Sequence, residues 1–131
     1  MYLLDTNICI YALKLERPVL RKLQEHGSAQ IAISSLVAAE LAYGVENSQK
    51  VESNRSVLED FLQELPVLPW PEAAMWHYAR HRKKLKALGT PIGEMDLLIA
   101  CHAVAADMTL VTNNTREFER IEGLKLENWI G

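Results

Sequence analysis

The 131-residue sequence has little cysteine and no long hydrophobic run. Its two cysteines, Cys9 and Cys101, lie inside apolar segments and form no Cys-x-x-Cys, so we expect two buried free thiols rather than a disulfide or a metal site. No window approaches the ~20 apolar residues of a membrane span. The first residues also lack the basic start and apolar stretch of a signal peptide. These absences predict a cytoplasmic protein without a membrane segment.

An excess of positive charge is missing as well. The chain carries 14 Lys and Arg against 17 Asp and Glu, a net charge of −3 at pH 7. This balance gives no support to an overall basic surface for nucleic acid, although charge can still be segregated locally. Hydrophobic residues make up 49% of the chain and charged residues 24%, which is ordinary for a globular protein. The length predicts one compact domain over residues 1–131.

Short apolar runs alternate with helical patterns along the chain. We expect strands at about 2–4, 31–33, 66–69, 109–112 and 124–129. We expect helices at about 7–15, 18–26, 36–43, 49–65, 71–88 and 95–106, the third of them ending at Gly44. Residues 113–120 are expected to form a turn and one or two helical turns. Such alternation indicates parallel strands with helical crossovers on both faces. The predicted fold is a three-layer α/β/α sandwich with a short sheet of four or five strands.

Asp5 follows directly after the first apolar run, and Thr6 and Asn7 come next. Open α/β sheets bind ligands in the crevice outside the carboxyl ends of their strands. Asp5 is therefore placed where such folds carry out their chemistry. Capping of the next helix explains an acid at this position equally well.

Two further acids lie on apolar helices. Glu40 is isolated among apolar and small residues, and Glu is rarely buried without a partner. A narrow solvated helix face is the alternative. Asp96 lies near the start of the most apolar helix, where Glu94 already satisfies the helix dipole. We therefore expect Asp96 to face a crevice between elements.

Glu117 follows the expected strand at 109–112, together with Asn113 and Asn114. A capping box at a helix start, with Asn113 or Asn114 as the cap and Glu117 in the first turn, explains these residues without any functional role. The joint pattern of four acids is more informative, because carboxylates that converge cannot all stay ionised without a cation. Oxygen ligands without a His or Cys cluster favour Mg²⁺ or Mn²⁺, and such ions usually serve phosphate chemistry.

The chain resembles PIN-domain ribonucleases of the VapC toxin type, from bacterial type II toxin–antitoxin pairs. The matching segments are 4–7, 34–44, 91–103 and 110–118, and their order and spacing cover essentially the whole chain. The resemblance implies a PIN-like fold with Asp5, Glu40 and Asp96 as catalytic metal ligands. Many members of the family carry Asp in the loop after the last main strand. Here Glu117 is the nearest acid, and we assign it the fourth catalytic and metal-binding position, with Asn114 as an alternative neutral ligand.

The resemblance also implies supporting roles for polar neighbours of these acids, namely Thr6, Asn7, Thr112 and Asn114. It implies an endoribonuclease that hydrolyses RNA phosphodiester bonds with Mg²⁺, or Mn²⁺ as a substitute, and thereby inhibits translation. Water is the nucleophile, and the products are a 5′-phosphate and a 3′-hydroxyl. Transfer RNA is the substrate we expect. The implied partners are a small VapB-like antitoxin and a second copy of the chain, in a homodimer.

A basic segment, residues 80–86, holds five of the fourteen Lys and Arg residues. A solvated helix face is one explanation of such a run. Its place just before Asp96 favours the other explanation, which is contact with RNA phosphates. The RNA-binding candidates are Arg80, Arg82, Lys83, Lys84 and Lys86.

Rival functions need residues that the sequence lacks. A phosphoacceptor receiver domain needs adjacent acids after the first strand and an acid after the third, and neither is present. A haloacid-dehalogenase-type phosphatase needs Asp-x-Asp, whereas position 7 is Asn. The alternative that stays open is a catalytically inactive PIN-like module that binds RNA or protein. Metal-dependent turnover distinguishes the enzyme from that module.

Overall fold

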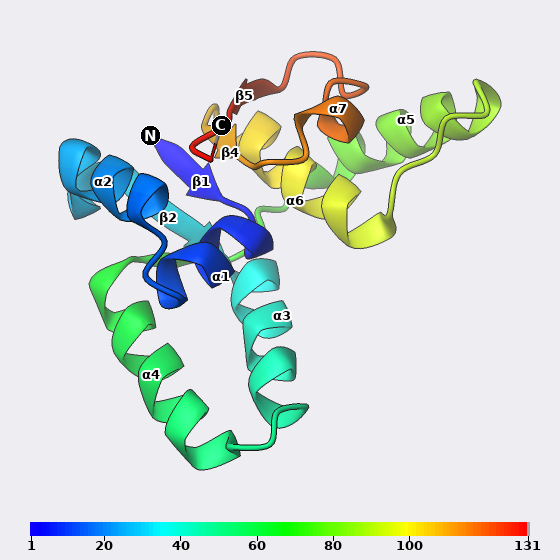
Figure 1. Ribbon diagram of the computed structural model, residues 1–131. Coiled ribbons are helices and arrows are strands. Elements are labelled where there is room, and N and C mark those ends of the chain that lie inside the picture. Colours follow the sequence, from blue (N-terminus) through cyan, green and yellow to red (C-terminus); the bar gives the residue numbers. More distant parts are fainter. Residues whose placement is uncertain (131) are drawn as a thin grey trace.

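A parallel sheet of five short strands lies at the centre of the computed structural model, which describes residues 1–130 (Figure 1). The strands are β1 (Tyr2–Leu4), β2 (Ile31–Ser34), β3 (Val67–Leu68), β4 (Thr109–Val111) and β5 (Lys125–Glu127). Their order is β3-β2-β1-β4-β5, and each neighbouring pair is parallel. Leu4 is level with Ile33 of β2 and with Val111 of β4, so the carboxyl ends of the three central strands meet at one edge.

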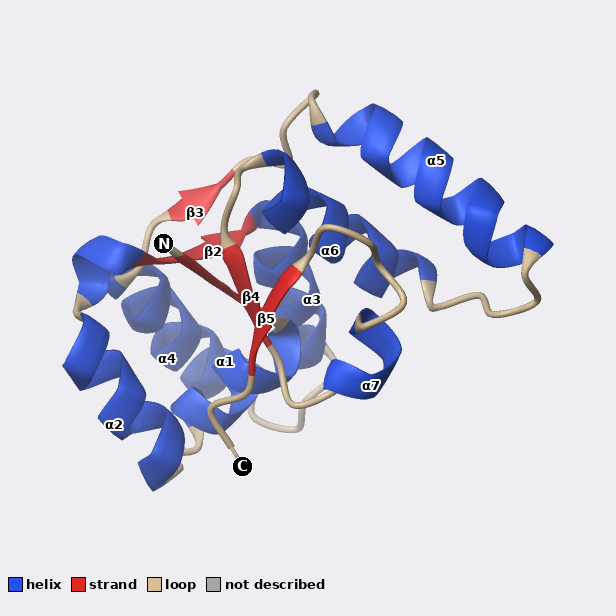
Figure 2. Cartoon of the chain, turned by 90° about the horizontal axis from the view of Figure 1, so that it is seen from above, coloured by secondary structure: helices blue, strands red, loops and turns tan. Residues whose placement is uncertain are grey.

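Helices surround this sheet. They are α1 (Thr6–Leu13), α2 (Arg17–His26), α3 (Ser35–Glu46), α4 (Val51–Glu64), α5 (Ala74–Ala87), α6 (Glu94–Ala105) and α7 (Thr115–Phe118), with a short 3₁₀ turn, η1 (Ser28–Gln30). Figure 1 shows α1 to α4 gathered toward one end of the molecule and α5 to α7 toward the other. Figure 2, seen from above, shows α3 beside α6, and α5 packs against α6. The predicted α/β/α sandwich is confirmed, in its five-stranded form.

Two strands pass directly into helices, and the residue at each junction caps the helix. Asp5 Oδ1 accepts a 2.9 Å hydrogen bond from the backbone N–H of Ile8 at the start of α1. Ser34 Oγ accepts one of 3.2 Å from the N–H of Leu36 at the start of α3. Each cap satisfies a backbone donor that the helix itself leaves free. This arrangement places polar side chains at the carboxyl edge of the sheet.

Helix α3 continues to Glu46, so the predicted end of this helix at Gly44 is wrong. A glycine inside a helix costs only about 0.5–1 kcal/mol relative to alanine, and packing against α4 and α1 outweighs that cost. The helix ends at Asn47, whose N–H bonds to the carbonyl of Tyr43. The hydroxyl of Ser48 donates to the carbonyl of Val45 at 2.6 Å and helps to end the helix.

The core consists of the central strands and the helices that pack on them. Fully buried side chains include Leu3, Leu4, Ile33, Leu110 and Val111, and each contributes about 1.5–3 kcal/mol by leaving water. Helix α6 is buried over most of its length. Both cysteines are free and buried, as predicted. Within residues 1–130, no helix combines the length and apolarity needed to cross a bilayer.

Candidate active site

Asp5 is held rigidly at the end of the central strand. Only 6% of the residue is exposed, and its own N–H bonds to the carbonyl of Val111 at 3.0 Å. Burial raises the pKa of the Asp5 carboxyl, hydrogen bonds from Thr112 and the backbone of Ile8 oppose this rise, and the charge of Glu40 adds to it. Asp5 therefore caps α1, as one interpretation predicted, and also faces another acid.

Glu40 is brought beside Asp5 by a single polar contact. The hydroxyl of Thr6 donates a 2.6 Å hydrogen bond to Oε1 of Glu40. Thr6 follows Asp5 in the sequence and lies in the first turn of α1, whereas Glu40 lies in the middle of α3. The half-buried Glu40 side chain is therefore turned toward the strand-end acid. This contact disfavours the alternative of a merely solvated helix face.

Asp96 lies in the first turn of α6, and the charges of the other three predicted acids all act on its carboxyl group. Its pKa is raised to about 6, first by burial and then by the charges of Glu117, Asp5 and Glu40. The backbone of Gly93 lies against the same carboxyl group, since a Cβ at Gly93 would stand 3.7 Å from Oδ2 of Asp96. The structure thus brings the four acids into one electrostatic cluster, which we call the acid cluster: Asp5, Glu40, Asp96 and Glu117.

Asn114 orients Glu117 at the other side of the cluster. The amide Nδ2 of Asn114 donates a 2.8 Å hydrogen bond to Oε2 of Glu117. The backbone N–H of Asn114 bonds in turn to Oγ1 of the fully buried Thr112 at 3.0 Å. Thr112 also lowers the pKa of the Asp5 carboxyl, so this residue acts on both sides of the cluster.

The chemistry of the acid cluster suits a divalent cation. Within residues 1–130, no Lys, Arg or His forms an ion pair with any of its four members. Uncompensated carboxylates are hard oxygen ligands of the kind that Mg²⁺ and Mn²⁺ prefer. The same described residues contain no group of three potential ligands already placed to hold a metal ion. The four carboxylates therefore fit the ion in chemical character.

The remaining predicted residues differ in their surroundings. Asn7 is exposed, and only its backbone N–H contacts Asp5. All five basic candidates, Arg80, Arg82, Lys83, Lys84 and Lys86, are exposed on α5. Arg82 pairs with Glu94 at 2.7 Å, and Lys84 pairs with Glu122 at 3.0 Å. Arg80, Lys83 and Lys86 form no ion pair among residues 1–130, so α5 keeps a basic surface.

Two buried or half-buried contacts near the site had no signal in the sequence. Asn113 Nδ2 donates to the hydroxyl of Tyr11 at 3.0 Å, which ties the loop after β4 to α1. Nδ1 of His102 lies 2.9 Å from Oγ of Ser34, which ties α6 to the start of α3. Burial lowers the pKa of His102. These contacts hold together the elements that carry the four acids.

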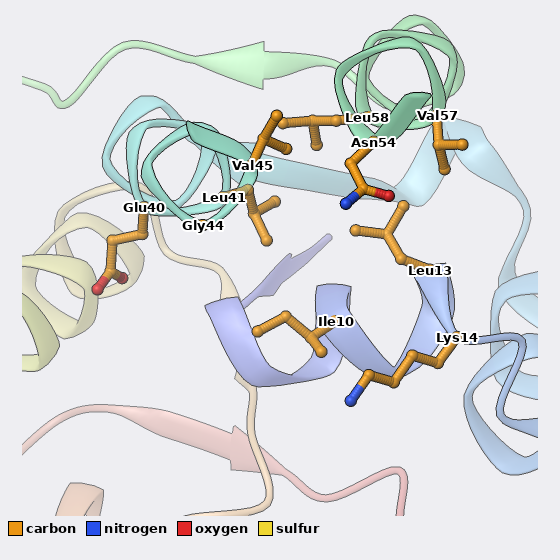
Figure 3. A pocket seen from close by; sticks show the side chains of 10 residues that line it. All are labelled: Ile10, Leu13, Lys14, Glu40, Leu41, Gly44, Val45, Asn54, Val57 and Leu58. Carbon is orange, nitrogen blue, oxygen red and sulfur yellow. The ribbon is translucent and has the colours of Figure 1, made fainter. Parts of the chain in front are cut away.

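An apolar groove begins at Glu40 and runs between α1, α3 and α4 (Figure 3). Its volume is about 380 Å³. Figure 3 shows apolar side chains from the three helices facing one another, while the Glu40 carboxylate points away from them at one end. The side chains that line it include Ile10, Leu13, Leu41, Val45, Val57 and Leu58. We call this surface the apolar groove.

Residues 2–124 match the model of the PIN domain family. The chain belongs to the PIN-domain family. It is similar to ribonuclease VapC2 of Rickettsia felis, with 46% identity over 98% of each chain. It is also similar to the tRNA(fMet)-specific endonuclease VapC of Shigella flexneri, with 41% identity over 98% of this chain and 97% of that protein. The family predicted from the four sequence segments is confirmed.

Solved structures of PIN-domain relatives have the same architecture. The crystal structure of VapBC2 from Rickettsia felis bound to a DNA fragment from their promoter superposes with a TM-score of 0.92, at 46% identity over 98% of each chain. That of DNA-bound VapBC from Salmonella typhimurium also gives a TM-score of 0.92, at 39% identity over 98% of this chain and 97% of the other. Both confirm the predicted fold.

Proposed function

We propose that this chain is the toxin of a type II toxin–antitoxin pair, and that it is a metal-dependent endoribonuclease that acts as a single domain. The observation that carries the proposal is the acid cluster at the carboxyl edge of the sheet, where burial and then the charges of the other three acids raise the pKa of Asp96. Such a site, on a PIN fold, suits metal-assisted hydrolysis of phosphodiesters. The names of the curated relatives, ribonuclease VapC2 and tRNA(fMet)-specific endonuclease, support the same activity.

The four carboxylates of the acid cluster would hold the divalent cation, Mg²⁺ or Mn²⁺, which when bound supplies charge neutralisation and an activated water. The protein's own groups prepare the site for it. Thr112 and the N–H of Ile8 fix Asp5, and Thr6 fixes Glu40. Asn114 fixes Glu117 through its amide. Because water is the nucleophile, hydrolysis needs no reactive side chain.

Transfer RNA is the substrate that we propose, and its cleavage would inhibit translation. Two of the curated relatives are named as endonucleases specific for tRNA(fMet). The exposed basic side chains of α5 lie on the helix that packs against α6, which carries Asp96. Contacts between these cations and phosphates would position the RNA next to the acids.

A small VapB-like antitoxin is the partner that we propose for the apolar groove. Structural relatives of this chain are VapBC complexes of toxin and antitoxin. The groove offers apolar side chains from three helices and ends at Glu40. An antitoxin helix fits it through an apolar face, and an adjoining basic residue would reach the acids. Such a partner would block the site in the cytoplasm, which is the compartment that we propose.

A second copy of the chain is the other partner in this proposal. Trp76 and Met75, in the first turns of α5, are 62% and 43% exposed. Exposed aromatic and Met side chains are enriched at protein interfaces. Sedimentation of the purified chain, compared with a Trp76→Lys variant, tests whether the proposed homodimer uses this surface. A dimer that persists in the variant places the interface elsewhere.

A cleavage assay tests the function. Purified protein, free of antitoxin, is incubated with tRNA(fMet) in Mg²⁺, in Mn²⁺ and in EDTA, beside the Asp5→Asn variant. We expect discrete cuts that need both the metal and Asp5 and that leave 5′-phosphate ends. If the folded protein binds this RNA and cuts neither it nor any RNA of a total bacterial extract, the chain is instead a catalytically inactive PIN-like binding module.

A further inference from the structure

A second hollow, which we call the α5–α6 pocket, lies between α5, α6 and the loop that joins them. Its volume is about 310 Å³. Its floor is apolar and is made by Leu85, Pro91, Ile92 and Leu97. Charged side chains at its rim come from both helices and are Arg82, Lys86 and Glu94. The function proposed above assigns α5 only a general attraction for phosphates and makes no use of this cavity.

The rim holds a cation in a fixed position. Arg82 donates through Nη1 to Oε1 of Glu94 at 2.7 Å and to the hydroxyl of Tyr78 at 2.6 Å. Its guanidinium also lies 5.8 Å from the centre of the Tyr78 ring. A guanidinium fixed in this way offers a flat surface on which a nucleic-acid base can stack. Glu94, which shares the rim, is an acceptor for the amino groups of bases.

A second cation of the rim has no such partner. Lys86 is exposed, and across residues 1–130 it takes part in no ion pair or side-chain hydrogen bond. It stands one helical turn beyond Arg82 on α5. An apolar floor between a fixed guanidinium and an exposed ammonium matches one nucleotide, because the base is flat and apolar on its faces and the phosphate is anionic.

The pocket and the acid cluster share helix α6 and the loop before it. Its rim residue Glu94 lies two positions before Asp96 in the first turn of α6. The intervening loop also packs on the site, since the backbone of Gly93 stands against the Asp96 carboxyl group. On the far side, Arg120 donates to the carbonyl of Pro91 at 3.2 Å and links the floor to the segment that follows α7 and Glu117. The pocket is therefore built on the same helix and loop as Asp96.

We propose that the α5–α6 pocket receives one unstacked base of the RNA, next to the scissile phosphate, and so selects where the chain is cut. This inference rests on the proposed ribonuclease function and gives the site a specificity element. The volume is at the lower end of the range of about 300–1,000 Å³ for ligand pockets, which suits a single base. Proteins read single-stranded RNA loops through splayed bases of this kind.

The test combines a filled pocket with an RNA that lacks one base. Ile92→Trp fills the cavity from the loop, where no helix has to change. Leu88→Trp is the matched control, because Leu88 is 66% exposed at the end of α5 and does not line the pocket. The RNA probes are the tRNA(fMet) anticodon stem-loop and a series of copies, each with one abasic position in the loop. Circular dichroism confirms that both variants are folded.

We expect one abasic position to lower kcat/KM of the wild type about tenfold, since stacking of one base contributes ~1–3 kcal/mol. Ile92→Trp should lower kcat/KM on the intact stem-loop by a similar factor and should no longer respond to that position. Leu88→Trp should keep both the rate and the response. Lys86→Ala leaves the floor of the pocket unchanged. This variant should bind the intact RNA more weakly and should still respond to the abasic position.

The outcomes separate this proposal from the function on which it rests. If abasic positions lower kcat/KM of Ile92→Trp as much as that of the wild type, the pocket proposal is wrong, even though the RNA is cut. If wild type cuts no RNA, the ribonuclease function fails instead. Binding of the same labelled RNAs to Asp5→Asn protein, measured by fluorescence anisotropy, then tests the pocket without cleavage. The pocket is supported if binding depends on one base and if adding Ile92→Trp abolishes that dependence. The proposal is also wrong if an acidic antitoxin segment binds at the pocket and no abasic position changes cleavage or RNA binding.

Discussion

The hydroxyl of Thr6 lies 2.6 Å from Oε1 of Glu40 and donates a hydrogen bond to it. The two residues are 34 positions apart, and their contact joins the first turn of α1 to the middle of α3. Since Thr6 directly follows Asp5, the position of Glu40 relative to Asp5 depends on this bond. It also gives the half-buried carboxylate a donor in place of water.

Thr6→Val removes the donor and preserves the shape of the side chain. A hydrogen bond to a charged group contributes about 1.5–3 kcal/mol, so we expect a loss of about tenfold or more in kcat/KM for RNA cleavage. Thr6→Ser keeps the hydroxyl and should cleave at close to the wild-type rate. Steady-state kinetics of the three proteins provide the measurement. Equal rates for Val and Ser at position 6 would show that Glu40 does not need this contact.

Asp96→Asn should stabilise the metal-free protein at pH 7. The pKa of Asp96 is raised to about 6 in the folded chain, above the ordinary value near 4 for unfolded Asp. Between pH 4 and pH 7 the folded wild type must ionise Asp96, although burial and the charges of three other acids disfavour its charged form. The free energy of unfolding of the wild type therefore falls as the pH rises. Because Asp96 is only half-buried and solvent screens its charge, we expect a reduced gain, about 1–2 kcal/mol for the variant at pH 7.

Urea denaturation in EDTA at several pH values measures this difference. At pH 4 the folded wild type has a neutral Asp96, so the advantage of the variant should shrink toward zero. Asp107→Asn is a suitable comparison, because Asp107 is exposed and pairs with Lys125. An advantage of Asp96→Asn that is constant from pH 4 to pH 7 contradicts the electrostatic explanation.

Divalent cations should stabilise the wild type against heat. An ion that binds only the folded state adds about 2.7 kcal/mol at a concentration 100 times its Kd. We expect Mg²⁺ or Mn²⁺ to raise Tm, and EDTA to reverse the effect. Asp5→Asn should lose most of the rise in Tm, while Asp107→Asn should keep it. Equal shifts in both variants mean that the ion binds outside the acid cluster.

Lys83 and Lys84 should differ in their contribution to RNA binding. Lys84 already pairs with Glu122 at 3.0 Å, whereas Lys83 forms no ion pair within residues 1–130. Lys83→Ala should reduce the slope of log K against log[salt] by about 0.7–0.9, the value for one phosphate contact. Lys84→Ala should change it less. Binding of tRNA in EDTA at several salt concentrations gives the slopes, and the opposite order contradicts the prediction.

Ser34→Ala should destabilise the chain more than a surface serine substitution. Ser34 is fully buried, caps α3 and lies 2.9 Å from Nδ1 of His102. Its removal leaves the buried His102 ring and the half-buried N–H of Leu36 without this partner, and a buried polar group without a partner costs about 1–3 kcal/mol. Urea denaturation should show this loss, while Ser28→Ala in η1, where the serine is exposed, should be close to neutral. A neutral Ser34→Ala would show that water replaces the hydroxyl.

The sequence by itself determined the order of strands and helices and the type of residue at each strand end. Apolar runs, caps and glycines are local signals, and Gly27 at the end of α2 has the positive φ of 76° that favours glycine. The family followed from four short segments for the same reason, since each keeps its local pattern. Local signals failed at Gly44, because packing of α3 outweighed the preference of a glycine for a helix end.

Only the tertiary structure decided which side chains meet. The bonds Thr6–Glu40, Ser34–His102 and Tyr11–Asn113 join residues 34, 68 and 102 positions apart. No local periodicity reports such pairs, because they arise when separate helices pack on one sheet. The raised pKa of Asp96 has the same origin, since it needs burial together with three charges from other elements. The chain supplies the acids locally, and the fold brings their charges together.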